Sequence, residues 1–240
     1  MSPRIVELRR DALSRHDRKA ALLRSHYRAH GTFVVNLLSS PGTGKTTLLA
    51  RILTRLVEMG VRPAALVGDC ATDNDAVRLA ASGAPVRQIV TEGMCHLEAG
   101  MIDSHLQGWD LSTVDILFIE NVGNLVCPSA FDLGESLRMV LLAVTEGEDK
   151  PLKYPQMFNS ADLVVITKTD LALACEFDRE LALTHLEQVR PGVVVLETSA
   201  KPHPAPGVED VIRYLLEEAG ISEAPTVRGK PTTEFSVNRR

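Results

Sequence analysis

The sequence has few cysteines, few aromatic residues and no long apolar run. Its four cysteines, Cys70, Cys95, Cys127 and Cys175, show no CxxC spacing, and the basic N-terminal segment lacks the apolar core of a signal peptide. We therefore expect these cysteines to be cytosolic thiols or metal ligands, and not parts of a disulfide framework. No stretch approaches the roughly 18 apolar residues of a membrane span. The formal net charge of -5 argues against non-specific nucleic-acid binding. We expect a cytoplasmic protein with no nucleic-acid partner.

The apolar pattern predicts an α/β fold. Nearly continuous apolar runs alternate with helical patterns, which is typical of a mostly parallel central sheet with helices on both faces. We expect strands in 32–38, 63–69, 86–90, 114–120, 136–147, 161–170 and 192–200, and helices in 4–29 (one or two), 46–60, 74–83, 97–107, 178–190 and 207–219. The predicted organisation is an N-terminal helical extension (1–30), a nucleotide-hydrolase domain (31–220) and a flexible C-terminal tail (221–240).

The segment "SSPGTGKTT", from Ser39 to Thr47, lies between a predicted strand and a predicted helix. This context is typical of a P-loop, whose glycines let backbone N–H groups turn toward phosphates. The lysine would meet the β- and γ-phosphates, and the next hydroxyl would bind Mg²⁺. Ser39 stands where the motif has its first glycine, and the alternative is a glycine-rich turn without nucleotide. The predicted phosphate-binding residues are Gly42, Thr43, Gly44, Lys45, Thr46 and Thr47.

Two further segments predict which base is bound. "TKTD" (167–170) and "TSAK" (198–201) each end a predicted strand and resemble the guanine-reading elements of GTPases. The Asp170 carboxylate would accept two N–H groups of guanine, Lys168 would lie along the ring, and the Ala200 N–H would meet the guanine oxygen. Ser199 completes the predicted guanine-binding set. Thr167 stands where asparagine is usual, so loop support is expected to be weaker. The alternatives are a charged turn, or a P-loop ATPase in which "TKTD" is incidental.

Carboxylates close two of the predicted strands. Asp69 and Glu120 would converge with Thr46 at the carboxyl edge of the sheet, where they would bind Mg²⁺. Gly123 would supply the N–H that senses the γ-phosphate, so Lys45, Asp69, Glu120 and Gly123 form the predicted catalytic set. Asp69 could instead cap a helix, and Asp75 could be a switch residue or a first-turn carboxylate. No arginine finger is evident.

The segment "ENVGNLVCP" (120–128) carries a cysteine four residues after the predicted switch glycine. "GMCHLEAGM" places Cys95 beside His96. Thiolate and imidazole groups suit zinc and nickel, although an isolated Cys-His pair is a weak signal. Cys127 would add a third ligand on the loop that senses the nucleotide.

Five segments together resemble the HypB family, the nickel-insertion GTPases of [NiFe]-hydrogenase maturation. They are "FVVNLLSSPGTGKTTLL", "GDCATDNDAVRL", "CHLEAGMI", "IENVGNLVCPSAFDLGE" and "GEDKPLKYPQMF", in order within roughly 20–220. The resemblance implies a SIMIBI-type P-loop GTPase using GTP and Mg²⁺, with Ni²⁺ or Zn²⁺ bound by Cys95, His96 and Cys127 near a dimer interface. It also implies a homodimer promoted by GTP, a HypA-type metallochaperone as partner and the hydrogenase large subunit as destination.

Some features depart from this family or leave alternatives open. The first 30 residues contain no cysteine and only scattered histidines, so we expect no separate N-terminal nickel store. Cys70 lies next to Asp69 and could approach the metal, although a half-buried structural cysteine is the favoured interpretation. Lys153 could reach a nucleotide across a dimer or be a surface lysine. A urease-type nickel accessory GTPase is one alternative, although its usual Cys-Pro-His motif is absent. A nucleotide-regulated scaffold with a structural zinc is another.

Overall fold

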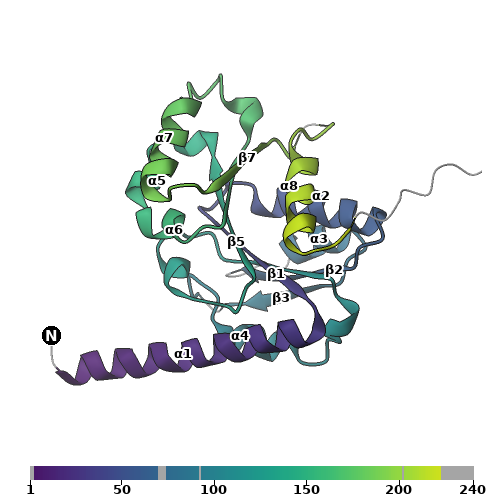
Figure 1. Cartoon of the computed structure of the whole chain (residues 1–240), viewed down its shortest axis with the longest axis vertical. Helices are drawn as coiled ribbons and strands as arrows, with labels where there is room; N and C mark the ends of the chain where they lie inside the picture. The colour runs from purple at the N-terminus through teal and green to yellow at the C-terminus, as the bar shows by residue number, and fades with distance from the viewer. Residues whose placement is uncertain (1–2, 70–73, 92, 202, 223–240) are drawn as a thin grey trace, which may run out of the picture.

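The computed structural model describes residues 3–69, 74–91, 93–201 and 203–222, and its centre is a seven-stranded parallel sheet (Figure 1). The strand order is β3-β2-β4-β1-β5-β6-β7. The strands are β1 (Phe33–Ser39), β2 (Pro63–Asp69), β3 (Val86–Val90), β4 (Ile116–Glu120), β5 (Leu137–Ala143), β6 (Leu163–Thr167) and β7 (Val194–Thr198). The predicted strands and the parallel sheet are therefore confirmed, with ends that differ by a few residues.

Helices cover both faces of the sheet. They are α1 (Pro3–His30), α2 (Lys45–Glu58), α3 (Asn74–Ala80), α4 (Ala99–Leu106), α5 (Lys150–Lys153), α6 (Pro155–Asn159), α7 (Arg179–Val189) and α8 (Val208–Glu218). The N-terminal pattern forms one continuous helix, which lies beside α4 and extends past the rest of the molecule (Figure 1). The short helices α5 and α6 were not predicted. No helix among the described residues is apolar enough over sufficient length to cross a membrane.

Alternating side chains of the central strands enter separate cores. In β1, Val35 and Leu37 pack in one core with α2 and α8, while Val34 packs on the opposite face with α1 and α4. A third core lies under α6 and α7. Because side chains in a strand point alternately to the two faces, a sheet covered on both sides needs apolar residues at successive positions. This requirement explains the nearly continuous apolar runs of the sequence.

The parallel arrangement places the predicted site residues along one edge of the sheet. The P-loop follows β1, Glu120 ends β4 beside it, and Thr167 ends β6. The segment 97–107 was predicted to be helical throughout, but α4 begins only at Ala99, after an extended Glu98. The Leu97 N–H donates to the Asn121 side chain at 3.1 Å, and this bond accompanies the delayed start of the helix.

Candidate functional site

The P-loop borders a cavity of about 520 Å³ at the carboxyl edge of the sheet. Gly42 and Gly44 have φ angles of 75° and 100°, which favour glycine over residues with a side chain. The Lys45 side chain is buried in this loop, and its Nζ donates to Ser39 Oγ at 2.9 Å. Burial lowers the pKa of Lys45. Ser39, which replaces the first glycine of the motif, thus holds the lysine in place.

Glu120 and Thr46 meet at the floor of the same cavity. Thr46 Oγ1 donates to Glu120 Oε1 at 2.7 Å, whereas Glu120 Oε2 is buried without a hydrogen-bond partner. Burial raises the pKa of Glu120 to about 7. A hydroxyl and a carboxylate with one free oxygen are suitable ligands for a hard cation such as Mg²⁺. Asp69 ends β2, but its side chain lies outside the described part of the structure.

Gly123 lies against Pro41 of the P-loop and lines the same cavity. A Cβ atom at this position would approach the Pro41 Cα to 2.9 Å, so the close contact requires glycine. Val122 and Gly123 line the cavity together with the P-loop. The structure therefore brings the predicted γ-phosphate sensor beside the predicted phosphate cradle.

Two residues of this region were missed by the sequence analysis. Arg78 lines the cavity with Asp75, and its Nη2 donates to Thr47 Oγ1 at 2.9 Å. Glu146 accepts from Thr43 Oγ1 at 3.2 Å and so holds the P-loop from the side of β5. The spacing of Asp75 and Arg78, one helical turn apart, was the available signal for a shared face.

A second cavity of about 200 Å³ adjoins the P-loop. Its lining includes Thr43, Gly44, Thr47, Leu48, Thr167, Lys168, Asp170, Leu171, Ala200 and Lys201. The Thr167 hydroxyl donates to the Thr43 carbonyl at 2.8 Å, so threonine supplies a direct tie to the P-loop despite lacking an amide. Ser199 Oγ accepts from the Asp170 N–H at 2.9 Å and donates to the Asp170 carboxylate. These bonds fix the carboxylate at the cavity edge, where it could accept from guanine.

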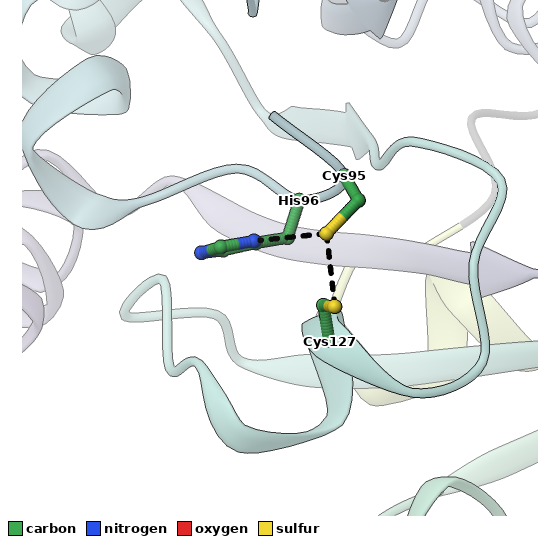
Figure 2. Close-up of side chains that lie close together, drawn as sticks. All are labelled: Cys95, His96 and Cys127. Carbon is green, nitrogen blue, oxygen red and sulfur yellow. Dashed lines mark hydrogen bonds between the residues drawn. The ribbon is translucent and has the colours of Figure 1, made fainter. Parts of the chain in front are cut away.

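Cys95, His96 and Cys127 come together from two loops (Figure 2). Their ligand atoms all lie within 4.8 Å of one another. The Cys95 and Cys127 sulfurs are 2.9 Å apart and point toward each other, and His96 Nδ1 is 3.7 Å from the Cys95 sulfur (Figure 2). Two thiols and an imidazole at these separations can hold a soft or borderline divalent metal.

The surroundings of His96 favour the neutral imidazole. Its ring stacks on Phe131 with centroids 3.9 Å apart, and its Nε2 lies 3.5 Å from the Glu98 carboxylate. Burial lowers the pKa of His96, and the neutral ring is the form that binds metals. Hydrogen bonding to Cys127 raises the pKa of the Cys95 thiol. Metal binding would therefore release a thiol proton.

Neither Cys175 nor Lys153 belongs to the sites described above. Cys70 falls outside the described residues, and Cys175 is exposed and outside the group of three. Lys153 is exposed and pairs with Asp149 at 2.6 Å on α5, and it lines neither of the two cavities beside the P-loop. In a single chain Lys153 is thus a surface lysine.

Comparison with known protein families places residues 33–197 in the family described as "CobW/HypB/UreG, nucleotide-binding domain". The hydrogenase maturation factor HypB of Azotobacter vinelandii is 48% identical over 199 residues, which is 82% of this chain and 65% of that protein. The hydrogenase/urease maturation factor HypB of Helicobacter hepaticus is 42% identical and is covered to 84%, as is this chain. The chain thus spans just under two thirds of the Azotobacter relative.

Solved structures show the same architecture. The crystal structure of HypB from Helicobacter pylori in complex with nickel superposes with a TM-score of 0.80 at 39% identity, covering 86% of this chain and 95% of that one. The signal recognition particle 54 kDa protein of Aeropyrum pernix, in complex with GDP, superposes with a TM-score of 0.56 at 15% identity, covering 79% and 49%. The latter likeness shows the P-loop fold alone.

Proposed function

The chain belongs to the HypB family, and from this premise we propose that it is a GTP-hydrolysing metallochaperone that delivers nickel during [NiFe]-hydrogenase maturation. One continuous segment, 120–127, carries this proposal. At its start Glu120 contacts the P-loop through Thr46, and at its end Cys127 contacts Cys95. A movement of this segment with nucleotide state would therefore act on both sites.

In this proposal residues 31–220 form the GTPase domain, in which different residues bind the base, the phosphates and the magnesium ion. Asp170 and the Ala200 backbone bind guanine, while Lys45 and the P-loop N–H groups bind the phosphates. Thr46, Glu120 and Asp69 hold Mg²⁺, which neutralises phosphate charge when bound. Gly123 donates its N–H to the γ-phosphate. Phosphoryl transfer depends mainly on such positioning and charge neutralisation.

Nickel is the cargo of the proposed reaction, and the same ligands suit zinc. Cys95, His96 and Cys127 supply three ligands, so a fourth position is left for water or for a second subunit. Structural zinc sites are closed with four protein ligands, and the exposed Cys95 favours an exchangeable metal instead. A GTP-promoted homodimer, a HypA-type donor and the hydrogenase large subunit as acceptor complete this proposal.

Urease maturation is a second candidate function. It is favoured by the name of the Helicobacter hepaticus relative, a hydrogenase/urease maturation factor. The two functions use the same metal and the same nucleotide, so they differ only in the protein that accepts the nickel.

The proposed enzymatic activity is tested by Mg²⁺-dependent GTP turnover of the purified chain. Lys45→Ala is expected to lower turnover by about 100-fold or more, because one group aimed at developing charge contributes effects of this order. Arg213→Ala removes an exposed positive charge on α8 that lines neither cavity, so this matched control should hydrolyse GTP at the parent rate. Equal turnover in the parent and Lys45→Ala would contradict the proposed activity.

A further inference from the structure

Two asparagines of the segment 120–127 are bonded to the other metal-binding loop. Asn121 Oδ1 accepts from the Leu97 N–H at 3.1 Å, and Asn124 Nδ2 donates to the Cys95 carbonyl at 3.2 Å. Cys95 and Leu97 flank His96 in the chain. The loop that carries two of the three metal-binding side chains is thus held on both sides by asparagines of the segment that carries the third.

Asn121 is fixed in its orientation by further contacts. Its side chain is 1% exposed, and its Oδ1 also accepts from the Val122 N–H at 3.0 Å. Its Nδ2 faces Asn36 Oδ1 on β1 at 3.5 Å. An amide with a carbonyl that accepts two N–H groups cannot rotate without leaving both unpaired, and buried unpaired groups are costly. Asn121 therefore ties the metal loop rigidly to the end of β4.

Asn124 has a different environment because it lies at the partly exposed end of the segment. Its Oδ1 accepts from the Val126 N–H at 2.8 Å, which shapes the turn into Cys127. Its Nδ2 crosses to the Cys95 carbonyl. The two atoms of one amide thus connect the backbone before Cys127 to the backbone of Cys95.

The two asparagines lie on either side of the residue that meets the phosphate loop. Between them is Gly123, which has no room for a Cβ against Pro41. A shift of Gly123 toward a γ-phosphate would thus displace Asn121, Asn124 and Cys127 together. Building on the proposed function, we propose that Asn121 and Asn124 are positioning residues that make the Cys95–His96 loop follow the nucleotide-sensing segment, so that nucleotide state sets the geometry of all three metal ligands.

Asn124 is the better residue for a test, because Asn121 also lines the phosphate cavity. Asn124→Asp keeps the oxygen that accepts from the Val126 N–H but removes the donor to the Cys95 carbonyl. Asn124→Ala removes both without adding charge. Gln188→Glu on the exposed face of α7 is the control for the amide-to-carboxylate change.

The measurement is the Ni²⁺ affinity of each purified variant, obtained by competition with a coloured chelator. It is made with Mg²⁺ and either a non-hydrolysable GTP analogue or GDP. The ratio of the Ni²⁺ affinities in the GTP-analogue and GDP states is expected to fall about fivefold toward one in both Asn124 variants. A change of this size corresponds to the free energy that one hydrogen bond contributes. Gln188→Glu should keep the parent ratio. GTP turnover of the variants without nickel should equal the parent value. This control excludes a general loss of structure, because a misfolded variant would also lose turnover.

The outcomes separate this inference from the proposed function. If the parent ratio differs from one and both Asn124 variants keep it, the tie does not transmit nucleotide state and the inference is overturned alone. If the parent itself shows a ratio of one, the proposed coupling of nucleotide and nickel is contradicted, and this inference with it.

Discussion

At the scale of single residues, Glu120 is a buried carboxyl group with one oxygen that lacks a hydrogen-bond partner. Its 3% exposure and its pKa of about 7 mean that the free protein holds the ionised form at a cost. A bound cation would remove this cost by pairing with the free oxygen. The magnesium site proposed above would thus lower the stability of the free protein, and a bound cation would restore it.

Replacing Glu120 by glutamine is expected to stabilise the free protein in a pH-dependent way. A carboxyl pKa raised above the unfolded value contributes stability that is present below about pH 4.5 and lost as the pH rises through about 7. At pH 8 the free energy of unfolding of Glu120→Gln should thus exceed that of the parent by up to about 3 kcal/mol. At pH 4.5 the two free energies of unfolding should differ little. Urea titrations without Mg²⁺ or nucleotide test this. A pH-independent difference would contradict the assigned pKa.

Asp170→Asn tests the assignment of the guanine pocket. An amide cannot accept both N–H groups of guanine, so the preference for GDP over ADP is expected to fall by about 100-fold. Competition against a fluorescent guanine nucleotide measures it. Asp178→Asn, which alters the N-cap of α7 away from the cavity, is the control and should keep the preference. Equal competition by ADP and GDP in the parent would show that this cavity does not select guanine.

The site residues that could be identified from the sequence are those that belong to compact motifs. The P-loop, "TKTD" and the Cys-His pair could be recognised because their spacing is local. Phe131, which stacks on His96, could not be predicted, because its contact depends on how the segment after Cys127 folds back. Asn121 and Asn124 were visible within "ENVGNLVCP", but their partners lie more than twenty residues away.

At the scale of elements, the segment after Cys127 also contacts α1. Arg24 makes two hydrogen bonds of 2.7 Å to the Asp132 carboxylate, and His16 Nε2 lies 2.8 Å from the Asp132 carbonyl oxygen. His16 also packs edge-on against Phe131, the residue that stacks on His96. The long N-terminal helix thus contacts the Phe131 ring, which in turn stacks on His96, one of the proposed metal ligands.

Gly134→Ala is expected to weaken the packing of α1. Gly134 has a φ of 79°, and a Cβ there would lie 2.8 Å from both the Ala20 carbonyl and the Arg24 nitrogen. Gly192→Ala is the matched control, since its φ is 74° and nothing lies within 4 Å. Both variants should lose about 1 kcal/mol from backbone strain, and Gly134→Ala about 1–3 kcal/mol more from the clash. Equal losses in urea unfolding would mean that α1 does not pack against Gly134.

The helices and strands were predictable because the apolar pattern is strong in a sheet covered on both faces. The short helices α5 and α6 were not predicted because each is only a few residues long and begins near a proline, Pro151 or Pro155. The start of α4 was placed too early because the Leu97 N–H is bonded across the fold to Asn121. Long-range hydrogen bonds of this kind leave no periodic trace in the sequence.

At the scale of the whole molecule, the parallel sheet brings two chemistries to one edge. The two cavities beside the P-loop lie at the ends of β1, β4 and β6, and Cys95, His96 and Cys127, the proposed metal ligands, lie on loops that follow β3 and β4. Glu120 and Cys127 are seven positions apart in the chain, and the segment between them contacts the phosphate loop at one end and Cys95 at the other. We propose that these two sites are coupled.

The most direct test of this claim is nickel affinity of the unmodified chain in its two nucleotide states. A competition titration with a coloured chelator is performed with Mg²⁺ and a GTP analogue, and then with Mg²⁺ and GDP. Allosteric coupling of about 1–3 kcal/mol is typical, so the two affinities are expected to differ by about 5- to 150-fold. Cys127→Ala should bind nickel more weakly and show no such difference, while still binding nucleotide. Identical affinities in the GTP-analogue and GDP states of the parent would contradict the account.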